Sequence, residues 1–295
     1  DRPSGCTRYF MSKIRFAFSL VLKEKEIFFF ALLQWITFSA GYLLWAQIFD
    51  WIPGSFWGNP DGAGIGLISS FLLLAWLFIC IGAISFPIGL LTGCMGASHF
   101  LVQQGKESTV AACLKLAFPQ IYPLWLFHWI DGWITASEIL NRVPSKHKTT
   151  SVAIRVLRKT LYYSWKLGVA GILPSIITGN SLIKSGQNSI KFIKYNSTDV
   201  AKLRIGYSFL CWGLAFSVCM ACFMYLKLTD DIPVSDLALA TKYDLYLWLA
   251  LPISSAAAII MLFFRPIYIL ALCDLYSDFL KETGEAVTLP ESPRN

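Results

Sequence analysis

Long apolar runs dominate this sequence and limit the folds it can adopt. Four of them contain no charged residue and cover residues 27–49, 65–91, 205–226 and 245–264. A helix needs about 20 apolar residues to cross a hydrocarbon core of about 30 Å. Only 15% of all residues are charged, whereas soluble domains contain roughly 25%. The sequence therefore predicts an all-α, polytopic integral membrane protein.

Two further apolar stretches, at about 117–136 and 162–183, are poorer candidates for plain spans. Prolines interrupt their helical pattern, and polar side chains lie within them. These residues are Pro119, Pro123, His128 and Asp131 in the first stretch, and Lys166, Pro174 and Asn180 in the second. Irregular backbone at membrane depth is tolerated only where protein or a water-filled cavity surrounds it.

The distribution of lysine and arginine predicts the topology. Six basic residues precede the first span, whereas the loop after it, residues 50–64, has none, so the amino terminus should be cytoplasmic. If all six stretches crossed, 16 basic residues would be inside and 8 outside, but if 117–136 and 162–183 entered and returned, the counts would be 22 and 2. We therefore expect four full spans plus two partly inserted helical hairpins, with both termini cytoplasmic. The alternative is six plain transmembrane helices.

The chain divides into four parts by composition. Residues 1–10 resemble a tag remnant or an upstream extension, and residues 11–26 have the spacing of an amphipathic helix with lysines on its polar face. Such a helix is expected on the cytoplasmic membrane surface, in contact with anionic lipids. Residues 27–280 form a single membrane domain, and residues 281–295 are expected to be a disordered tail.

Small and aromatic residues mark expected packing sites and interface positions. Gly89 and Gly93 form a small-xxx-small pair, which favours close helix packing. Tryptophan is typical of the headgroup level. The expected interfacial anchors are Trp51, Trp57, Trp125, Trp129 and Trp133, the last three forming one stripe at helical spacing.

Four polar residues of the two doubtful stretches are candidates for an ion or solute path: His128, Asp131, Lys166 and Asn180. Ionisable residues at membrane depth are costly and usually functional, and a broken helix can expose backbone groups to an anion. The alternative is that His128 and Asp131 meet water at the interface while Lys166 extends to the headgroups. Arg265 reads as a cytoplasmic stop that could pair with Asp131 or Asp274.

No catalytic motif is present, so an enzyme is the least expected class. The sequence has no nucleophile elbow, metalloprotease helix or phosphate loop, and only three histidines. We expect no metal site, no cofactor and no nucleic-acid partner, because the basic residues lie beside apolar spans and report orientation.

Four weak motifs carry a resemblance to a known family. They are the basic opening Ser-Lys-Ile-Arg at 12–15, the amphipathic-then-apolar block 107–140, Ile-Leu-Pro at 172–174 and Phe-Arg-Pro-Ile-Tyr at 264–268. The layout resembles an uncharacterised bacterial family of polytopic inner-membrane proteins, a domain of unknown function, which implies a bacterial inner-membrane protein and no known chemistry. The arrangement of spans and hairpins is also similar to the bacterial sulfate permease family of the cysteine pathway, in architecture only.

Two functions are compatible with these features. The first is a small-solute or anion permease or channel, indicated by the broken helices and the basic cytoplasmic surface. The second is a non-catalytic scaffold or accessory subunit of a larger membrane complex. The expected partners are the lipid bilayer and a second copy of the chain or another membrane protein.

Overall fold

The computed structural model describes residues 6–47, 51, 67–142, 152–228 and 254–284, and these are helical with short connecting turns. The described part of the chain contains no β-strand. Its elements are α1 (Cys6–Lys23), α2 (Lys25–Ala46), α4 (Leu67–Gln103), α5 (Val110–Ala117), the 3₁₀ turn η2 (Phe118–Gln120), α6 (Ile121–Arg142), α7 (Val152–Gly168), α8 (Ile172–Ile177), α9 (Leu182–Leu228), the π-helical turn η4 (Ile260–Phe264) and α11 (Arg265–Glu282).

Five described helical segments are long and apolar enough to cross a membrane, by length and composition. They are Lys25–Trp45, Phe71–Gln103, Val110–Glu138, Leu182–Ala221 and Ser254–Glu282. This confirms the predicted all-α polytopic class. Four of the five overlap the runs expected to be full spans, and the fifth contains the 117–136 stretch, for which partial insertion was expected.

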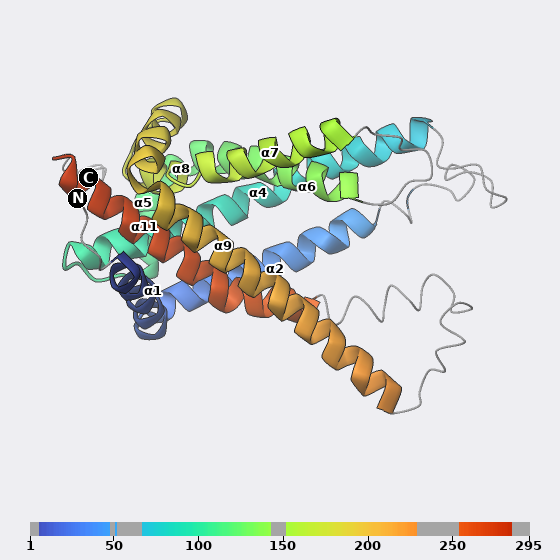
Figure 1. Cartoon of the computed structure of the whole chain (residues 1–295), viewed down its shortest axis with the longest axis horizontal. Coiled ribbons are helices and arrows are strands. Elements are labelled where there is room, and N and C mark those ends of the chain that lie inside the picture. Colours follow the sequence, from blue (N-terminus) through green and yellow to red (C-terminus); the bar gives the residue numbers. More distant parts are fainter. Residues whose placement is uncertain (1–5, 48–50, 52–66, 143–151, 229–253, 285–295) are drawn as a thin grey trace.

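The helices run in two directions (Figure 1). α2, α4, α6, α7, most of α9, and α11 lie lengthwise along the molecule. By contrast, α1 and the first turns of α9 lie crosswise at the end where α1 begins and α11 ends. This is the arrangement expected of a bundle through a bilayer with two helices on one membrane surface.

The stretch 117–136 forms a continuous helix after an initial break. Pro119 lies in η2, and Pro123 lies in the first turn of α6, where a missing N–H leaves no intrahelical bond unmade. α6 therefore lies lengthwise along the bundle, and α7 lies beside it (Figure 1). The stretch 117–136 therefore does not turn back on itself, contrary to the hairpin expected there.

The break in the stretch 162–183 lies on either side of Pro174 rather than at it. Pro174 is the third residue of the six-residue helix α8, a position without a bond to lose. The chain turns after Gly168, and it turns again at Gly179, whose φ is 88°. Glycine adopts this left-handed conformation without the steric cost that a Cβ would add.

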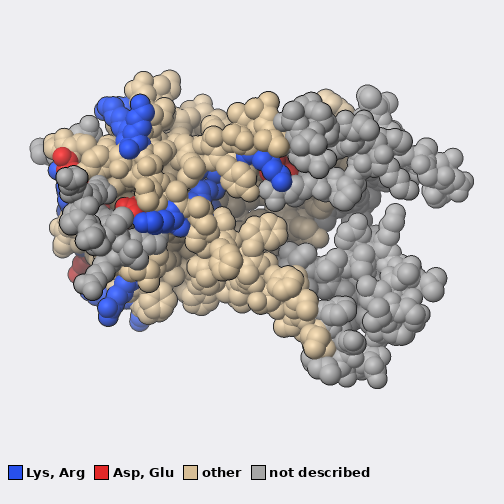
Figure 2. Space-filling view, viewed as in Figure 1, with Lys and Arg blue, Asp and Glu red and all other residues tan. Residues whose placement is uncertain are grey.

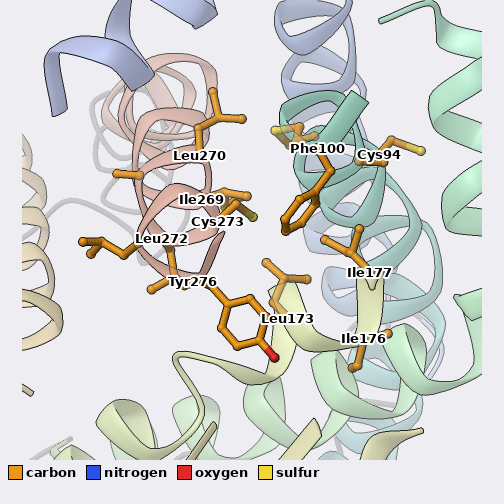
Figure 3. Packing of buried hydrophobic residues seen from close by; sticks show 14 of the residues in the cluster. Cys94, Phe100, Leu173, Ile176, Ile177, Ile269, Leu270, Leu272, Cys273 and Tyr276 are labelled. Carbon is orange, nitrogen blue, oxygen red and sulfur yellow. The ribbon is translucent and has the colours of Figure 1, made fainter. Parts of the chain in front are cut away.

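Buried hydrophobic residues of α4, α8 and α11 meet in one part of the core, as Figure 3 shows. Gly96 of α4 makes this meeting possible. A Cβ at Gly96 would overlap the side chain of Ile177 and lie 3.2 Å from the Cys273 sulfur. The absence of a side chain at one position therefore brings three helices together.

α4 and α6 form the most extensive helix pair. A Cβ at Gly89 would lie 3.0 Å from the Leu124 carbonyl oxygen, and one at Gly93 would lie 2.6 Å from Leu124 Cδ1. Trp125 Nε1 donates to the Gly82 carbonyl over 2.8 Å. The predicted small pair and part of the tryptophan stripe therefore lie in a helix–helix contact.

The boundaries of the four parts predicted from composition differ from those of the helices. α1 begins at Cys6, so residues 6–10, assigned to an extension, belong to the same helix as residues 11–23. α11 continues to Glu282, and residues 285–295 of the predicted tail lie outside the described residues. Trp57 also lies outside them, whereas Trp51 is exposed and its ring lies 5.3 Å from that of Trp76.

Candidate functional site

An ion pair joins α6 to α7 inside the bundle. Lys166 Nζ lies 2.5 Å from Asp131 Oδ1, and Trp165 Nε1 donates to the same oxygen over 3.2 Å. Lys166 is buried and Asp131 is half-buried. A pair of charges removed from water is stable only when its hydrogen bonds are satisfied, and the indole N–H supplies one of them.

His128 lies one helical turn before Asp131 on α6. Its Nδ1 lies 2.9 Å from the Leu124 carbonyl oxygen. His128 and Asp131 interact electrostatically, and Lys166 acts on both. The structure thus brings together three of the four residues that the sequence nominated for a path.

A π-helical turn places Arg265 near this pair. The Arg265 N–H donates to the Ile260 carbonyl, five residues back, and Pro266 follows without an N–H of its own. Such π-bulges are frequent at functional sites. Arg265 interacts electrostatically with Asp131, and its guanidinium lies 3.5 Å from Thr92 Oγ1. The helix itself continues past Arg265 to Glu282.

Thr92 connects Arg265 to the first long helix. Gln34 Nε2 of α2 donates to Thr92 Oγ1 over 2.6 Å and to the Ile88 carbonyl over 3.2 Å. The Gln34 Oε1 atom is buried and accepts no hydrogen bond from the described residues. Buried amide oxygens usually have a donor, so this atom is an unused acceptor inside the bundle.

α9 contributes a second arginine. Arg204 donates to the Tyr268 hydroxyl over 3.2 Å, and the Tyr207 and Tyr268 rings lie 4.6 Å apart. Arg204 and Lys166 also interact electrostatically. We refer to the connected set as the central polar band, which consists of Gln34, Thr92, His128, Asp131, Lys166, Arg204, Tyr207, Arg265 and Tyr268.

The charges of the central polar band do not balance. Lys166, Arg204 and Arg265 are cations, while Asp131 is its single carboxylate within the described residues. Figure 2 shows basic side chains following one another across α9 and α7 on this face. In a weakly polar interior, uncompensated charge is costly, so the band favours the presence of an anion.

A second polar group, which we call the end cluster, joins α1 to α11 and α4. Lys13 Nζ lies 2.8 Å from Asp274 Oδ2 and 2.5 Å from Asp278 Oδ2. Gln103 Nε2 donates to Asp274 Oδ1 over 3.0 Å. Burial lowers the pKa of Lys13, but the hydrogen bonds and charges of Asp274 and Asp278 outweigh it and raise this pKa above the usual 10.5. Lys13 is therefore a cation at neutral pH.

The end cluster borders a surface pocket of about 480 Å³ and a buried histidine. His99 is fully buried, with Nε2 3.7 Å from Asp274 Oδ1, and neither ring nitrogen has a hydrogen bond among the described residues. Lys13 and Lys281 face Asp274 and Asp278, so the charges of the end cluster balance.

Asn180 lies apart from the other nominated residues. Its side-chain amide donates to the Ser175 carbonyl over 3.2 Å and to Thr178 Oγ1 over 3.2 Å, within the turn between α8 and α9. It holds the turn that Gly179 makes. The predicted pairing of Arg265 with Asp274 is not formed, because Lys13 occupies that carboxylate.

Sequence reasoning missed Gln34, Thr92 and Arg204, and it interpreted Arg265 as a cytoplasmic stop that could pair with Asp131 or Asp274. Gln34 and Thr92 are each a single polar residue beside or within an apolar run. A long-range partner is required to distinguish such a residue from a surface one. The described residues contain no group of three or more metal-ligating acidic, histidine or cysteine side chains.

Comparison with protein-family models, curated proteins and solved structures finds no match for this chain. The resemblance to the bacterial inner-membrane family thus stays a prediction.

Proposed function

We propose that this membrane protein is a permease or channel for small anions, with the central polar band as its binding region. The excess of cations in that band carries the proposal. Lys166, Arg204 and Arg265 come from three different helices, and Asp131 is the single carboxylate of the band within the described residues. An anion would supply the missing negative charge and accept hydrogen bonds from the guanidinium groups, which suit carboxylate, sulfate or phosphate oxygens.

The shape of the bundle supports a path beside these residues. The π-helical turn at η4 and the break around α8 are both irregular backbone within a membrane domain. Such irregularity is tolerated where it lines a cavity or is buried in protein, and transporters use it for binding sites.

Anion flux into proteoliposomes tests the proposal. The full chain would be reconstituted and loaded with chloride, sulfate or phosphate tracers in turn. We expect flux of at least one of these anions, and a loss of about tenfold or more in Lys166→Gln and in Arg265→Gln, since each removes a charge-assisted contact.

Lys115→Gln is the matched control. Lys115 is exposed on α5 and outside the central polar band, so its neutralisation should leave flux unchanged. Absence of flux for every anion would refute the proposal, and equal flux in Lys166→Gln and Lys115→Gln would refute the site.

We further propose that the protein lies in a bacterial inner membrane with both termini in the cytoplasm. The excess of basic residues before the first span supports this orientation. Gln47 follows α2 and Val152 begins α7, both at the end of the bundle opposite Gln104 (Figure 1). Cysteines at Gln47 and Val152 in a background free of native cysteines should react with an impermeant reagent in intact cells, whereas a cysteine at Gln104 should not. Reaction at Gln47 alone would restore the arrangement with two short hairpins.

A scaffold or accessory subunit is the second candidate, favoured by one face of α9. Ile205, Phe209, Trp212 and Phe216 recur every three or four residues on this helix and are strongly exposed. This spacing gives a continuous apolar face, which either lipid or another membrane helix can cover. Co-purification of a stoichiometric membrane partner, lost in Phe209→Ala/Trp212→Ala, together with absent anion flux would support the scaffold.

A further inference from the structure

The first limb of α9, residues 182–196, presents both isoleucines and lysines on its outer face. The limb ends at Asn196, whose backbone φ of −114° and ψ of 27° are not helical. The bend turns the limb crosswise to the bundle (Figure 1). The limb therefore has one face against the end of the bundle and one face directed away from it.

The inner face of this limb makes both apolar and polar contacts with the protein. Phe192 is fully buried against Tyr276 and Phe279. Asn188 Nδ2 donates to Ser175 Oγ over 3.2 Å. Ser189 Oγ donates to the Gly168 carbonyl over 2.7 Å and accepts the Gly171 N–H over 2.8 Å. These bonds satisfy the backbone groups left free where α7 ends and α8 begins, so this face is committed to the protein.

The outer face is apolar and basic. Ile183 is 80% exposed and Ile190 is 55% exposed, and residues seven apart lie on the same face of a helix. Lys191 and Lys194 are exposed beside them, as is Lys184. The limb contains no acidic residue, and Figure 2 shows a group of basic side chains at its position.

We propose that this limb is a docking surface for anionic phospholipids of the surrounding membrane. The isoleucines enter the boundary between headgroups and acyl chains, while the lysines meet the phosphates, as in amphipathic helices that lie in a membrane surface. Charge complementarity selects this occupant over a zwitterionic lipid, because the limb offers only cations. The limb lies at the same end as α1, so the two crosswise helices would bind the same leaflet.

Hydrogen–deuterium exchange of the full chain in nanodiscs tests this inference. The discs would contain phosphatidylcholine alone or a mixture with phosphatidylglycerol. Amides of residues 182–196 should exchange at least about tenfold more slowly in the mixture than in phosphatidylcholine alone. The reason is that each lysine near an anionic surface strengthens binding by about fivefold. The variant Lys191→Gln/Lys194→Gln should lose most of this difference.

Arg158→Gln/Lys159→Gln is the charge-matched control, since both residues are exposed on α7; it should keep the full difference. Ile183→Ser/Ile190→Ser should speed exchange in both lipids, and size-exclusion profiles report whether each variant is folded. Equal exchange of the wild-type limb in the two lipids would overturn the proposal. So would protection that depends on a co-purifying protein and ignores lipid charge.

Discussion

The central polar band and the end cluster contain similar side chains in different charge balance. Among the described residues, the band contains one carboxylate and three cations, whereas the end cluster contains two carboxylates and two lysines. The band joins lengthwise helices at mid-bundle, and the cluster fastens the crosswise helix α1 to α11.

The difference indicates different roles. A balanced cluster at the end of the bundle stabilises the attachment of a helix and needs no further ligand. An unbalanced group in a poorly polar interior lowers stability unless another ion compensates it. The band is thus the better candidate for function, and the cluster for structure.

Asp131→Asn should have the largest effect on stability. It leaves Lys166 without its partner and Arg265 without a nearby negative charge, and losing one partner of a buried pair costs about 3–5 kcal/mol. Equilibrium unfolding in mixed micelles measures this cost. The matched change in the end cluster, Asp278→Asn, should cost clearly less, because Lys13 still binds Asp274; equal costs would remove the distinction between the two regions.

Asp131→Asn/Lys166→Gln should recover part of the stability lost in Asp131→Asn. The double variant removes one cation together with the carboxylate, and the two residues are in contact, so their effects are not additive. A coupling energy of about 1–3 kcal/mol is expected. Strict additivity in the same unfolding assay would mean that the Lys166–Asp131 contact contributes no energy.

Lys13→Gln should destabilise the attachment of α1 by about 1–3 kcal/mol, since Asp274 and Asp278 lose a charged donor. Faster hydrogen–deuterium exchange of residues 6–23 would report it, with the exchange of α4 and α6 unchanged. Lys23→Gln is a suitable control, because Lys23 is an exposed residue of the same helix. An effect spread evenly over the bundle would argue against a local fastening role.

The smallest effect is expected from pH. The pKa of Lys13 is raised above 10.5 in the folded chain, so its contribution is complete below that pH and is lost as pH rises through the folded-state value. The rate of hydrogen–deuterium exchange of α1 amides, divided by the intrinsic rate at each pH, should stay constant from neutral pH to about pH 9. It should increase only above pH 10.5. The Lys13→Gln variant should lack that increase.

The spans were predictable because their signal is local. An apolar run of about 20 residues has few structures open to it in a bilayer. The course of α6 was less predictable, because two criteria disagree. The count of basic residues favours a stretch that enters the membrane and returns, whereas the continuous helix favours one that runs lengthwise. η2 and the first turn of α6 accommodate Pro119 and Pro123, so the prolines do not turn the chain back.

The site was predictable only in part, for a related reason. His128, Asp131 and Lys166 stand out as ionisable residues in apolar stretches. Asn180 has the same polarity, but its position after Gly179 makes it a turn residue. Gln34 and Arg204 can be recognised as part of the site only through their hydrogen-bond partners Thr92 and Tyr268, which are more than fifty residues away in the sequence. No local sequence pattern contains this information.

The bend at Asn196 also affects how deep the rest of α9 lies in the membrane. α9 has 47 residues, and a straight helix of that length would measure about 70 Å, more than twice the hydrocarbon thickness. With the limb held at the headgroups, Arg204 lies about 12 Å and Tyr207 about 16 Å further along the helix, close to half of a core of about 30 Å. If the limb docks as proposed, the bend thus places Arg204 and Tyr207 near the middle of the membrane, where an ion crossing the bilayer meets its highest barrier.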